Sequence, residues 1–317
     1  MIKDLKDGFS ASGIYLIKSC VKGVSNSASS NSYLNVVLQD NSGVIDAKKW
    51  DASTEDLEKF QTGKILRIDG QCYSYKDKLQ VKILGAYEID EHEVNLDSLI
   101  IGSPIPLDIL KNEFKEFYNS VKNPDCKIIL EEVFKRYFKK FVDYPAAVSC
   151  HHDFFHGLLY HTVSMCKLAK QIQLLYGDVD YDILISGCLL HDIGKVIEFS
   201  SPIAPKYTIE GNLLGHISIG MSIVKEIADE KHIDSEVPLL LEHMILSHHG
   251  KQEYGSPVLP ETREALLLSM IDDMDSKMMV LDKAYKGVPE GSRTDKIFSF
   301  DNRTFYKPYK LKNDKKS

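Results

Sequence analysis

Residues 188–195, CLLHDIGK, carry an apolar run directly into an adjacent histidine and aspartate, followed by a glycine and a lysine. An isolated buried charge is costly, so a carboxylate at the end of an apolar segment needs a counter-charge. Neighbouring residues on a helix point about 100° apart, so His191 and Asp192 cannot use one helix face together. They can share a bound cation where the helix ends. We therefore expect this stretch to be the centre of a metal site.

The chain around this stretch, from residue 107 to residue 302, has the pattern of an all-α domain. Apolar residues recur there at spacings of three and four, and no strand-like alternation interrupts them. A domain of this length can bury a substantial core. Helices are expected over the runs LDILKNEFKEFYNSV, CKIILEEVFKRYFKKF, LLYHTVSMCKLAKQIQLLY, YDILISGCLLHDIGK, LGHISIGMSIVKEIADE, PLLLEHMILSHHG and TREALLLSMIDDMDSKMMVLDKAY.

The histidines supply further candidate ligands. The chain has 11, and none lies in its first 90 residues. Four lie near the polar ends of apolar helices and one aspartate lies in a fifth helix: His161, His191, His216, His248 and Asp272. Helical bundles build metal sites from side chains that project inward from facing helices, so these residues can converge on one point. Imidazole and carboxylate together suit Mn, Fe, Co or Zn.

Asp192 has two carboxylate oxygens and can bridge two ions. We expect the first ion to be completed by His161, His191 and Asp272. The second would be held by His216 and by His248 or its neighbour His249. Two ions about 3.5–4 Å apart generate a hydroxide nucleophile and clamp a phosphoryl group. The ligand set therefore predicts hydrolysis of a phosphate ester.

The first 90 residues predict a small β-barrel. Five short runs rich in Val, Ile, Leu and Tyr are separated by turn formers; they are GIYLIKSCV, SYLNVVLQD, VIDAKKW, KILRIDGQCYSY and KLQVKILGAYEI. Residues 40–43, DNSG, favour a hairpin, and residues 51–60 favour one short helix between the third and fourth strands. This order matches a Greek-key barrel of the OB type, with a five-stranded SH3-like barrel as the alternative.

The predicted architecture is therefore an α+β chain of two domains. Residues 1–90 form the barrel and residues 107–302 the helical bundle. Residues 91–106 end in a Pro-x-Pro pair, which disfavours both helix and strand, and form the linker. Residues 303–317 carry six cations against Asp314 alone, and we expect a solvated basic tail.

The ordered motifs of the second domain resemble the HD superfamily of metal-dependent phosphohydrolases. The segments that carry the resemblance are HHDFFHGLLYHT, LLHDIGK, GHISIG, LSHHG and IDDMDSKM. The resemblance selects Asp272 as the last ligand, with Asp273 and Asp275 as alternatives. It also implies that Asp192 and Lys195 are catalytic and that Lys195 contacts a substrate phosphate. The alternative for Lys195 is a structural role, in which its positive charge interacts favourably with the negative C-terminal end of the helix dipole. His156 stands where a small residue, commonly glycine, is expected.

A barrel ahead of such a domain resembles, more narrowly, the YhaM-type 3′→5′ exoribonucleases. That resemblance implies hydrolysis of single-stranded RNA from its 3′ end to nucleoside 5′-monophosphates by a metal-activated water. It implies two divalent ions, with Mn²⁺ first and Co²⁺, Fe²⁺, Zn²⁺ or Mg²⁺ as alternatives. No residue visibly reads a 2′-hydroxyl, so single-stranded DNA stays open as a substrate.

Four aromatic residues in or near the predicted strands are candidates for stacking on RNA bases: Tyr33, Trp50, Tyr73 and Tyr75. The alternative is that such rings fill the barrel core. Cations and carboxylates balance in the first 90 residues, so binding would rest on stacking plus a few lysines, namely Lys48, Lys49, Lys76 and Lys78. His152 either lines the substrate path or is solvated. His232 and His243 are expected to be structural or exposed, and Asp275 to pair with Lys277 or to lack a partner.

Composition limits the remaining possibilities. The chain is 43% hydrophobic and 27% charged with a formal net charge of −7, so it lacks a global basic field for nucleic acid. No secretory signal or membrane-length apolar run occurs, and six scattered cysteines suit reduced thiols in the cytoplasm. A homo-oligomer is possible. The alternative functions are a phosphohydrolase of small nucleotides and a single-stranded nucleic-acid-binding protein; the filled ligand positions disfavour the second.

Overall fold

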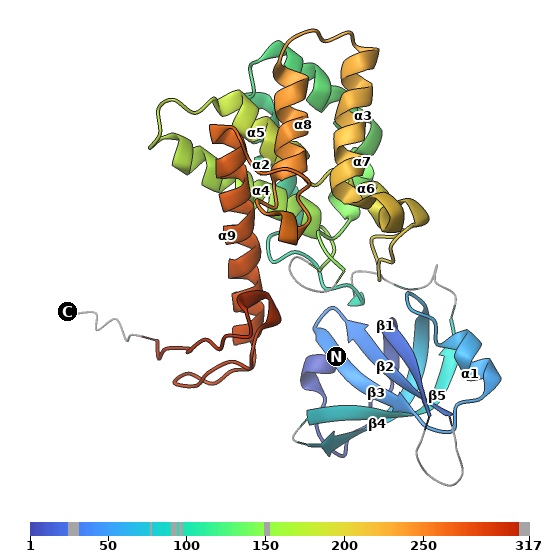
Figure 1. Ribbon diagram of the computed structural model, residues 1–317. Coiled ribbons are helices and arrows are strands. Elements are labelled where there is room, and N and C mark those ends of the chain that lie inside the picture. The colour runs from blue at the N-terminus through green and yellow to red at the C-terminus, as the bar shows by residue number, and fades with distance from the viewer. Residues whose placement is uncertain (25–31, 77, 90–93, 95–97, 149–152, 311–317) are drawn as a thin grey trace.

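The computed structural model describes residues 1–24, 32–76, 78–89, 94, 98–148 and 153–310. A β-barrel at the N-terminal end is followed by a helical domain, as predicted (Figure 1). Their cores are separate clusters, one built from barrel strands and one from helices. The barrel and the helices therefore each bury a core of their own.

The barrel is closed by five strands, β1 (Gly13–Val24), β2 (Ser32–Asp40), β3 (Gly43–Lys49), β4 (Ile65–Tyr75) and β5 (Lys78–Glu88). Their order around the barrel is β1-β2-β3-β5-β4, and β4 closes onto β1. All pairs are antiparallel except β3 with β5. Helix α1 (Thr54–Lys59) lies between β3 and β4, where the OB arrangement requires one. This confirms the OB-type barrel.

Local sequence explains these elements. Along β4 the buried residues Leu66, Ile68 and Cys72 alternate with more exposed ones, the period-2 pattern of a strand with one face in a core. The predicted hairpin turn joins β2 to β3, and the Asp40 carboxylate accepts a hydrogen bond from the Ser42 backbone at 2.8 Å. Ser53 and Asp56 form a reciprocal capping box that starts α1.

The helical domain surrounds α5 (Tyr181–Leu190). Residues 183–190 are all buried, and a helix that is apolar on every side belongs at the centre of a domain. The other helices are α2 (Leu107–Ser120), α3 (Pro124–Asp143), α4 (Gly157–Gln173), α6 (Lys195–Glu198), α7 (Ile209–Glu230), α8 (Val237–Ser247) and α9 (Arg263–Tyr285). Short 3-10 turns occur at Ile2–Asp4, Gln252–Tyr254 and Phe298–Phe300. No helix among the described residues is long and apolar enough to cross a membrane.

The described part of the expected solvated tail is largely exposed, but it is paired with the chain that precedes it. Residues 303–307 pair with residues 291–297 through the Arg293–Tyr306 and Ile297–Arg303 bridges. The reason is apolar packing inside the basic run, because the Phe300 and Phe305 rings lie 4.7 Å apart. Residues 311–317 lie outside the described part of the chain.

The barrel and the helical domain meet through specific side chains. Leu99, in the expected linker, is buried in a cluster with Leu16 and Ile65 of the barrel. The Asp153 carboxylate lies 3.4 Å from the Lys18 ammonium on β1 and 2.8 Å from the Lys283 ammonium on α9. Asp153 therefore connects the barrel to the last helix of the domain.

Candidate metal centre

Five elements bring the predicted ligands together. His161 lies on α4, His191 and Asp192 directly follow α5, His216 lies on α7, His248 and His249 directly follow α8, and Asp272 lies on α9. Gly215 precedes His216 with φ 71°, a left-handed conformation that suits glycine and kinks α7. Four of the predicted ligands thus follow the C-terminal ends of α5 and α8, and the other three lie within α4, α7 and α9.

Asp192 lies at the centre of this group. Its Oδ2 atom is 3.3 Å from His191 Nε2 and 3.8 Å from His161 Nε2. Its Oδ1 atom is 3.5 Å from His216 Nε2 and 3.8 Å from His248 Nε2. Each carboxylate oxygen therefore faces a different set of histidines, which is the arrangement that a bridging ligand needs.

The first set contains His161, His191 and Asp192, whose ligand atoms lie within 4.8 Å of one another. Asp272 joins them, since its Oδ1 atom is 3.2 Å from His161 Nε2 and its side chain is largely buried. Asp273 instead pairs with Lys277 at 2.7 Å on the exposed side of α9. The structure thus supports Asp272 over Asp273.

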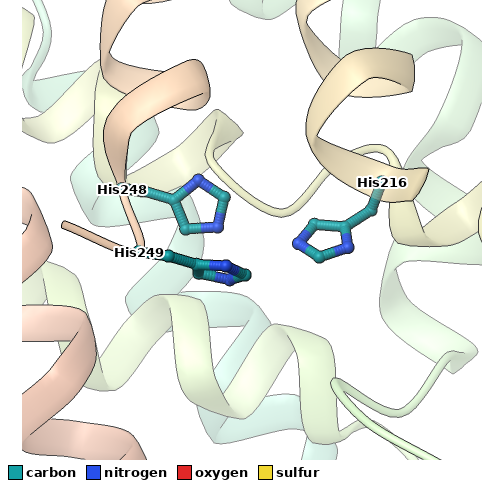
Figure 2. A group of neighbouring side chains, drawn as sticks. All are labelled: His216, His248 and His249. Carbon is teal, nitrogen blue, oxygen red and sulfur yellow. The ribbon is translucent and has the colours of Figure 1, made fainter. Parts of the chain in front are cut away.

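The second set contains His216, His248 and His249, whose ligand atoms also lie within 4.8 Å of one another. Figure 2 shows the three rings gathered around one space, with His216 opposite the other two. The His248 and His249 rings are 4.2 Å apart at their centroids. The sequence left His248 and His249 as alternatives, and the structure brings both to the site.

Hydrogen bonds fix the tautomer of these histidines. The Nδ1 atoms of His191, His248 and His249 donate to the backbone carbonyls of Cys188, Ile245 and Tyr254, at 2.9, 2.7 and 2.8 Å. The Nδ1 atoms of His161 and His216 donate to the carboxylates of Asp275 and Glu198, at 2.7 and 3.1 Å. Nδ1 is thus occupied in each ring, which leaves Nε2 as the nitrogen that faces the centre and can bind a metal once it is deprotonated.

The electrostatics of the site suit a cation. Burial would raise the pKa of Asp192, but Lys195 and His191 hold the pKa well below its ordinary value. Burial lowers the pKa of His248 well below its ordinary value, so this ring is neutral. Burial alone would lower the pKa of His161, but Asp272 and Asp275 outweigh it and raise the pKa to about 10. A proton on His161 and a divalent ion would therefore compete for the position beside the carboxylates of Asp192 and Asp272.

Unsatisfied buried atoms at the centre also indicate that these residues fit a divalent ion. Asp192 Oδ1, His216 Nε2 and His248 Nε2 are buried and have no hydrogen-bond partner among the described residues. Buried polar atoms are almost always satisfied, and leaving three of them together would cost several kcal/mol. Ions between these atoms would satisfy all three.

Lys195 lies at the edge of the same centre. Its ammonium is buried and donates to Asp192 Oδ2 at 2.6 Å. The residue begins the four-residue helix α6 and lies five positions beyond the last residue of α5, Leu190. Gly194 is needed beside it, because a Cβ atom there would lie 2.0 Å from the His216 carbonyl oxygen.

The sequence interpretation missed Glu198, and it gave Asp275 only as an alternative ligand or as a partner of Lys277. Glu198 was not considered, yet its carboxylate accepts from both the backbone N and the Nδ1 of His216. The expected pair of Asp275 with Lys277 is wrong, because Asp275 binds His161 and the Ser164 hydroxyl across to α4. The signal for Asp275 in the sequence is its spacing, since residues three apart on a helix lie on the same face and Asp275 is three residues after Asp272. Glu198 had none, since its partner is 18 residues away.

The other singled-out histidines lie apart from the ligands. His156 has φ 68°, which explains why glycine suits that position, and its Nδ1 atom bonds the Val142 carbonyl at 2.6 Å. His243 accepts from the Glu261 backbone at 2.9 Å, as expected for a structural residue. His152 lies outside the described residues.

The four predicted stacking residues lie on the barrel surface rather than in its core. Trp50, Tyr73 and Tyr75 line a surface cavity of about 290 Å³ together with Lys48, Gln80 and Lys82. Tyr33 lies 5.2 Å from Trp50 between ring centroids, and the Lys48 ammonium lies over both rings. Lys49 instead approaches Asp56. One barrel face therefore presents aromatic rings and cations together.

This combination of a histidine–aspartate centre and a helical domain places the chain in the class of HD-domain proteins. The HD domain family matches residues 158–277, a span that contains every predicted metal ligand.

More specifically, the chain belongs to the YhaM family. The 3′-5′ exoribonuclease YhaM of Bacillus licheniformis is 42% identical over 294 residues, which cover 92% of this chain and 93% of that protein. The protein of the same name from Bacillus subtilis is equally similar over the same shares.

Solved structures are more remote. The second OB-fold domain of replication protein A from Methanococcus maripaludis is 15% identical with a TM-score of 0.25, and the match covers 29% of this chain and 94% of that domain. The HD domain of L. monocytogenes phosphodiesterase PgpH is 17% identical with a TM-score of 0.29, and the match covers 54% of this chain and 77% of that one.

Proposed function

We propose that this protein is a 3′→5′ exoribonuclease that hydrolyses single-stranded RNA to nucleoside 5′-monophosphates. Membership of the YhaM family supports the direction and the substrate. The single observation that carries the chemistry is the placement of Asp192, whose two oxygens face two separate groups of histidines.

We infer that two divalent ions are required, with Mn²⁺ the first candidate. His161, His191 and Asp272 would hold one ion, His216, His248 and His249 the other, and Asp192 would bridge them. Such ions lower the pKa of a bound water and neutralise charge on a phosphoryl group. Mixed imidazole and carboxylate ligands suit Mn²⁺ but also accept Co²⁺, Fe²⁺, Zn²⁺ and Mg²⁺.

The protein's own residues prepare this chemistry. Glu198 and Asp275 hold the rings of His216 and His161 with Nε2 directed at the centre. Lys195 keeps Asp192 ionised, and its positive charge would lie beside the anionic oxygens of a bound phosphate. Preorganised charges of this kind stabilise developing negative charge without further reorganisation.

The barrel face of Tyr33, Trp50, Tyr73 and Tyr75 would hold the RNA strand, each stacked base contributing about 1–3 kcal/mol. Single-stranded DNA could stack on the same rings. The described cysteines are free thiols, which supports a reducing cytoplasm as the location.

The decisive experiment is incubation of 5′-labelled single-stranded RNA with the protein and Mn²⁺, with and without chelator. A metal-dependent ladder that shortens from the 3′ end is expected. Asp192→Ala should abolish the ladder and leave the fold and RNA binding largely intact, because Asp192 touches both ligand groups. Full activity of that variant would exclude the metal mechanism, and RNA of unchanged length with the unaltered protein would indicate a binding protein.

A second experiment separates RNA from small nucleotides as the substrate. Trp50→Ala should weaken binding of single-stranded RNA about 5- to 150-fold by loss of one stacking platform. Tyr87→Ala is the matched control, because Tyr87 is also an exposed barrel aromatic but lines a different surface cavity. Equal RNA affinity of both variants would favour a phosphohydrolase of small nucleotides.

A further inference from the structure

The chain beyond α9 forms a compact projection, which we call the arm and define as residues 291–310. Its two segments pair through backbone hydrogen bonds, including Thr294 to Phe305 at 2.9 Å and Lys307 to Ser292 at 2.8 Å. The 3-10 turn Phe298–Phe300 forms its tip, where Asp301 and Asn302 have φ values of 52° and 61°. The arm continues from the C-terminal end of α9 (Figure 1).

Side chains hold the arm in one shape and fasten it to α9. Phe300 is buried against Phe305, and the Arg303 guanidinium lies 5.7 and 5.6 Å from the centroids of these rings. The Lys307 ammonium donates to the carbonyls of Tyr285 and Val288 at 2.9 and 2.7 Å. A preformed element of this kind loses little conformational entropy when it binds a ligand.

The surface of the arm combines exposed aromatic rings with positive charge. The Phe298 side chain at the tip is 87% exposed and Tyr309 is 67% exposed. The arm carries five cationic residues and two acidic ones, in a chain whose formal net charge is −7. Exposed rings next to cations are the chemistry that binds single-stranded nucleic acid without sequence preference.

The arm lies on a helix that reaches both the metal centre and the barrel. Thirteen residues separate Asp272 from Tyr285 along α9, which is about 20 Å of helix. Near that end, Lys283 shares Asp153 with Lys18 of the barrel. The arm therefore follows the end of α9 that contacts the barrel through Asp153, about 20 Å along the helix from the metal centre.

We propose that the arm is a second surface for single-stranded RNA, which holds the strand outside the metal centre in addition to the barrel. This rests on the proposed exoribonuclease function. The cations that contact phosphate would be Lys296 and Lys310, and Phe298 would stack on a base. A second copy of this chain is the other conceivable occupant of an exposed aromatic tip. The excess of positive charge favours the polyanion, because the chain as a whole is acidic.

The test measures RNA binding by the full-length protein without hydrolysis. The probe is a 5′-fluorescent single-stranded RNA of about 20 nucleotides, longer than the site of one OB barrel, with chelator present. The Phe298→Ala/Lys296→Ala variant should bind about tenfold more weakly, as expected for one lost stack. The slope of log affinity against log salt concentration should become about 0.7 shallower for the lost phosphate contact.

The matched control is Tyr176→Ala/Lys170→Ala. This pair is also an exposed aromatic with an exposed lysine, but Lys170 lies in the last turn of α4 and Tyr176 just beyond it. Both are near the opposite end of α9, where Asp178 contacts Arg263. Its affinity should equal that of the unaltered protein. Melting temperatures of both variants verify that they are folded.

Sedimentation of the same samples separates the two occupants. Unchanged RNA affinity in the arm variant would overturn the proposal, and so would a loss of affinity that appears only together with a change in assembly state. Because this test measures RNA affinity in the presence of chelator, its outcome is independent of whether the protein hydrolyses RNA. A protein that fails to cleave RNA could still confirm the arm, and an active exoribonuclease could still refute it.

Discussion

Glu198 and Asp275 do not face the metal centre themselves but hold two of its histidines by hydrogen bonds. Each is a carboxylate that accepts from the Nδ1 atom of a ligand histidine. Such partners fix the ring orientation and increase the basicity of the other nitrogen. The two groups of ligands each contain one histidine held in this way, and the remaining three described rings use backbone carbonyls.

We predict that Glu198→Ala lowers Mn²⁺ affinity about 10- to 100-fold, the usual effect of losing such a partner. Glu198→Gln should recover part of the loss, since its amide oxygen can still accept from His216. Titration calorimetry with Mn²⁺ measures both. Glu210→Ala, an exposed carboxylate in the first turn of α7, is the control. Wild-type Mn²⁺ affinity in Glu198→Ala would mean that the backbone alone positions His216.

A parallel prediction concerns α9. Asp275→Asn should also reduce Mn²⁺ affinity about 10- to 100-fold, because the carboxylate that orients His161 is lost. Asp273→Asn changes a neighbouring acid on the same helix that pairs with Lys277 on the exposed side. Only the first substitution should alter the metal titration. Equal titration curves for the two variants would rule out a positioning role for Asp275.

Between elements, the tightest constraint is the contact of α6 with α7. Gly194 has no room for a side chain, since a Cβ atom would lie 2.0 Å from the backbone oxygen of His216. We predict that Gly194→Ala reduces the free energy of unfolding by about 1–3 kcal/mol or more, as overpacking does in a close-packed interior. It should also weaken metal binding, because α7 carries His216.

Urea unfolding of Gly194→Ala and Gly177→Ala measures this effect. Gly177 is the matched control, because a Cβ atom there meets nothing within 4 Å. Its substitution should leave the unfolding midpoint nearly unchanged. A stable Gly194→Ala protein would show that α7 can move away from α6 without cost.

Elements whose signal is local were predictable from the sequence. The helical periodicity, the DNSG hairpin and the short helix between the third and fourth strands all appear where expected. The contact of Glu198 with His216 and the folding of residues 303–307 were not predictable. The first joins residues that only the docking of α6 on α7 brings together. The second depends on the stacking of Phe300 on Phe305, which a count of charges does not register.

The molecule as a whole depends on how the barrel is held against the helical domain. Beside the apolar cluster of Leu16, Ile65 and Leu99, one carboxylate, Asp153, receives the ammonium groups of Lys18 and Lys283. Asp153 is largely buried while both lysines are partly exposed, so the two contacts are partly screened by solvent. We expect these two ion pairs to orient the barrel relative to the helical domain more than they stabilise the folded protein.

We therefore predict that Asp153→Asn leaves the melting temperature within about 2 °C, because partly exposed pairs contribute at most about 1 kcal/mol. It should lower kcat/KM on long single-stranded RNA several-fold, mainly through KM, because the barrel no longer holds the strand in line with the metal centre. Hydrolysis of a dinucleotide, too short to need the barrel, should be unaffected. Asp229→Asn, which breaks a pair with Lys225 inside α7, is the control. An equal loss on both substrates would instead mean that Asp153 supports the metal centre itself.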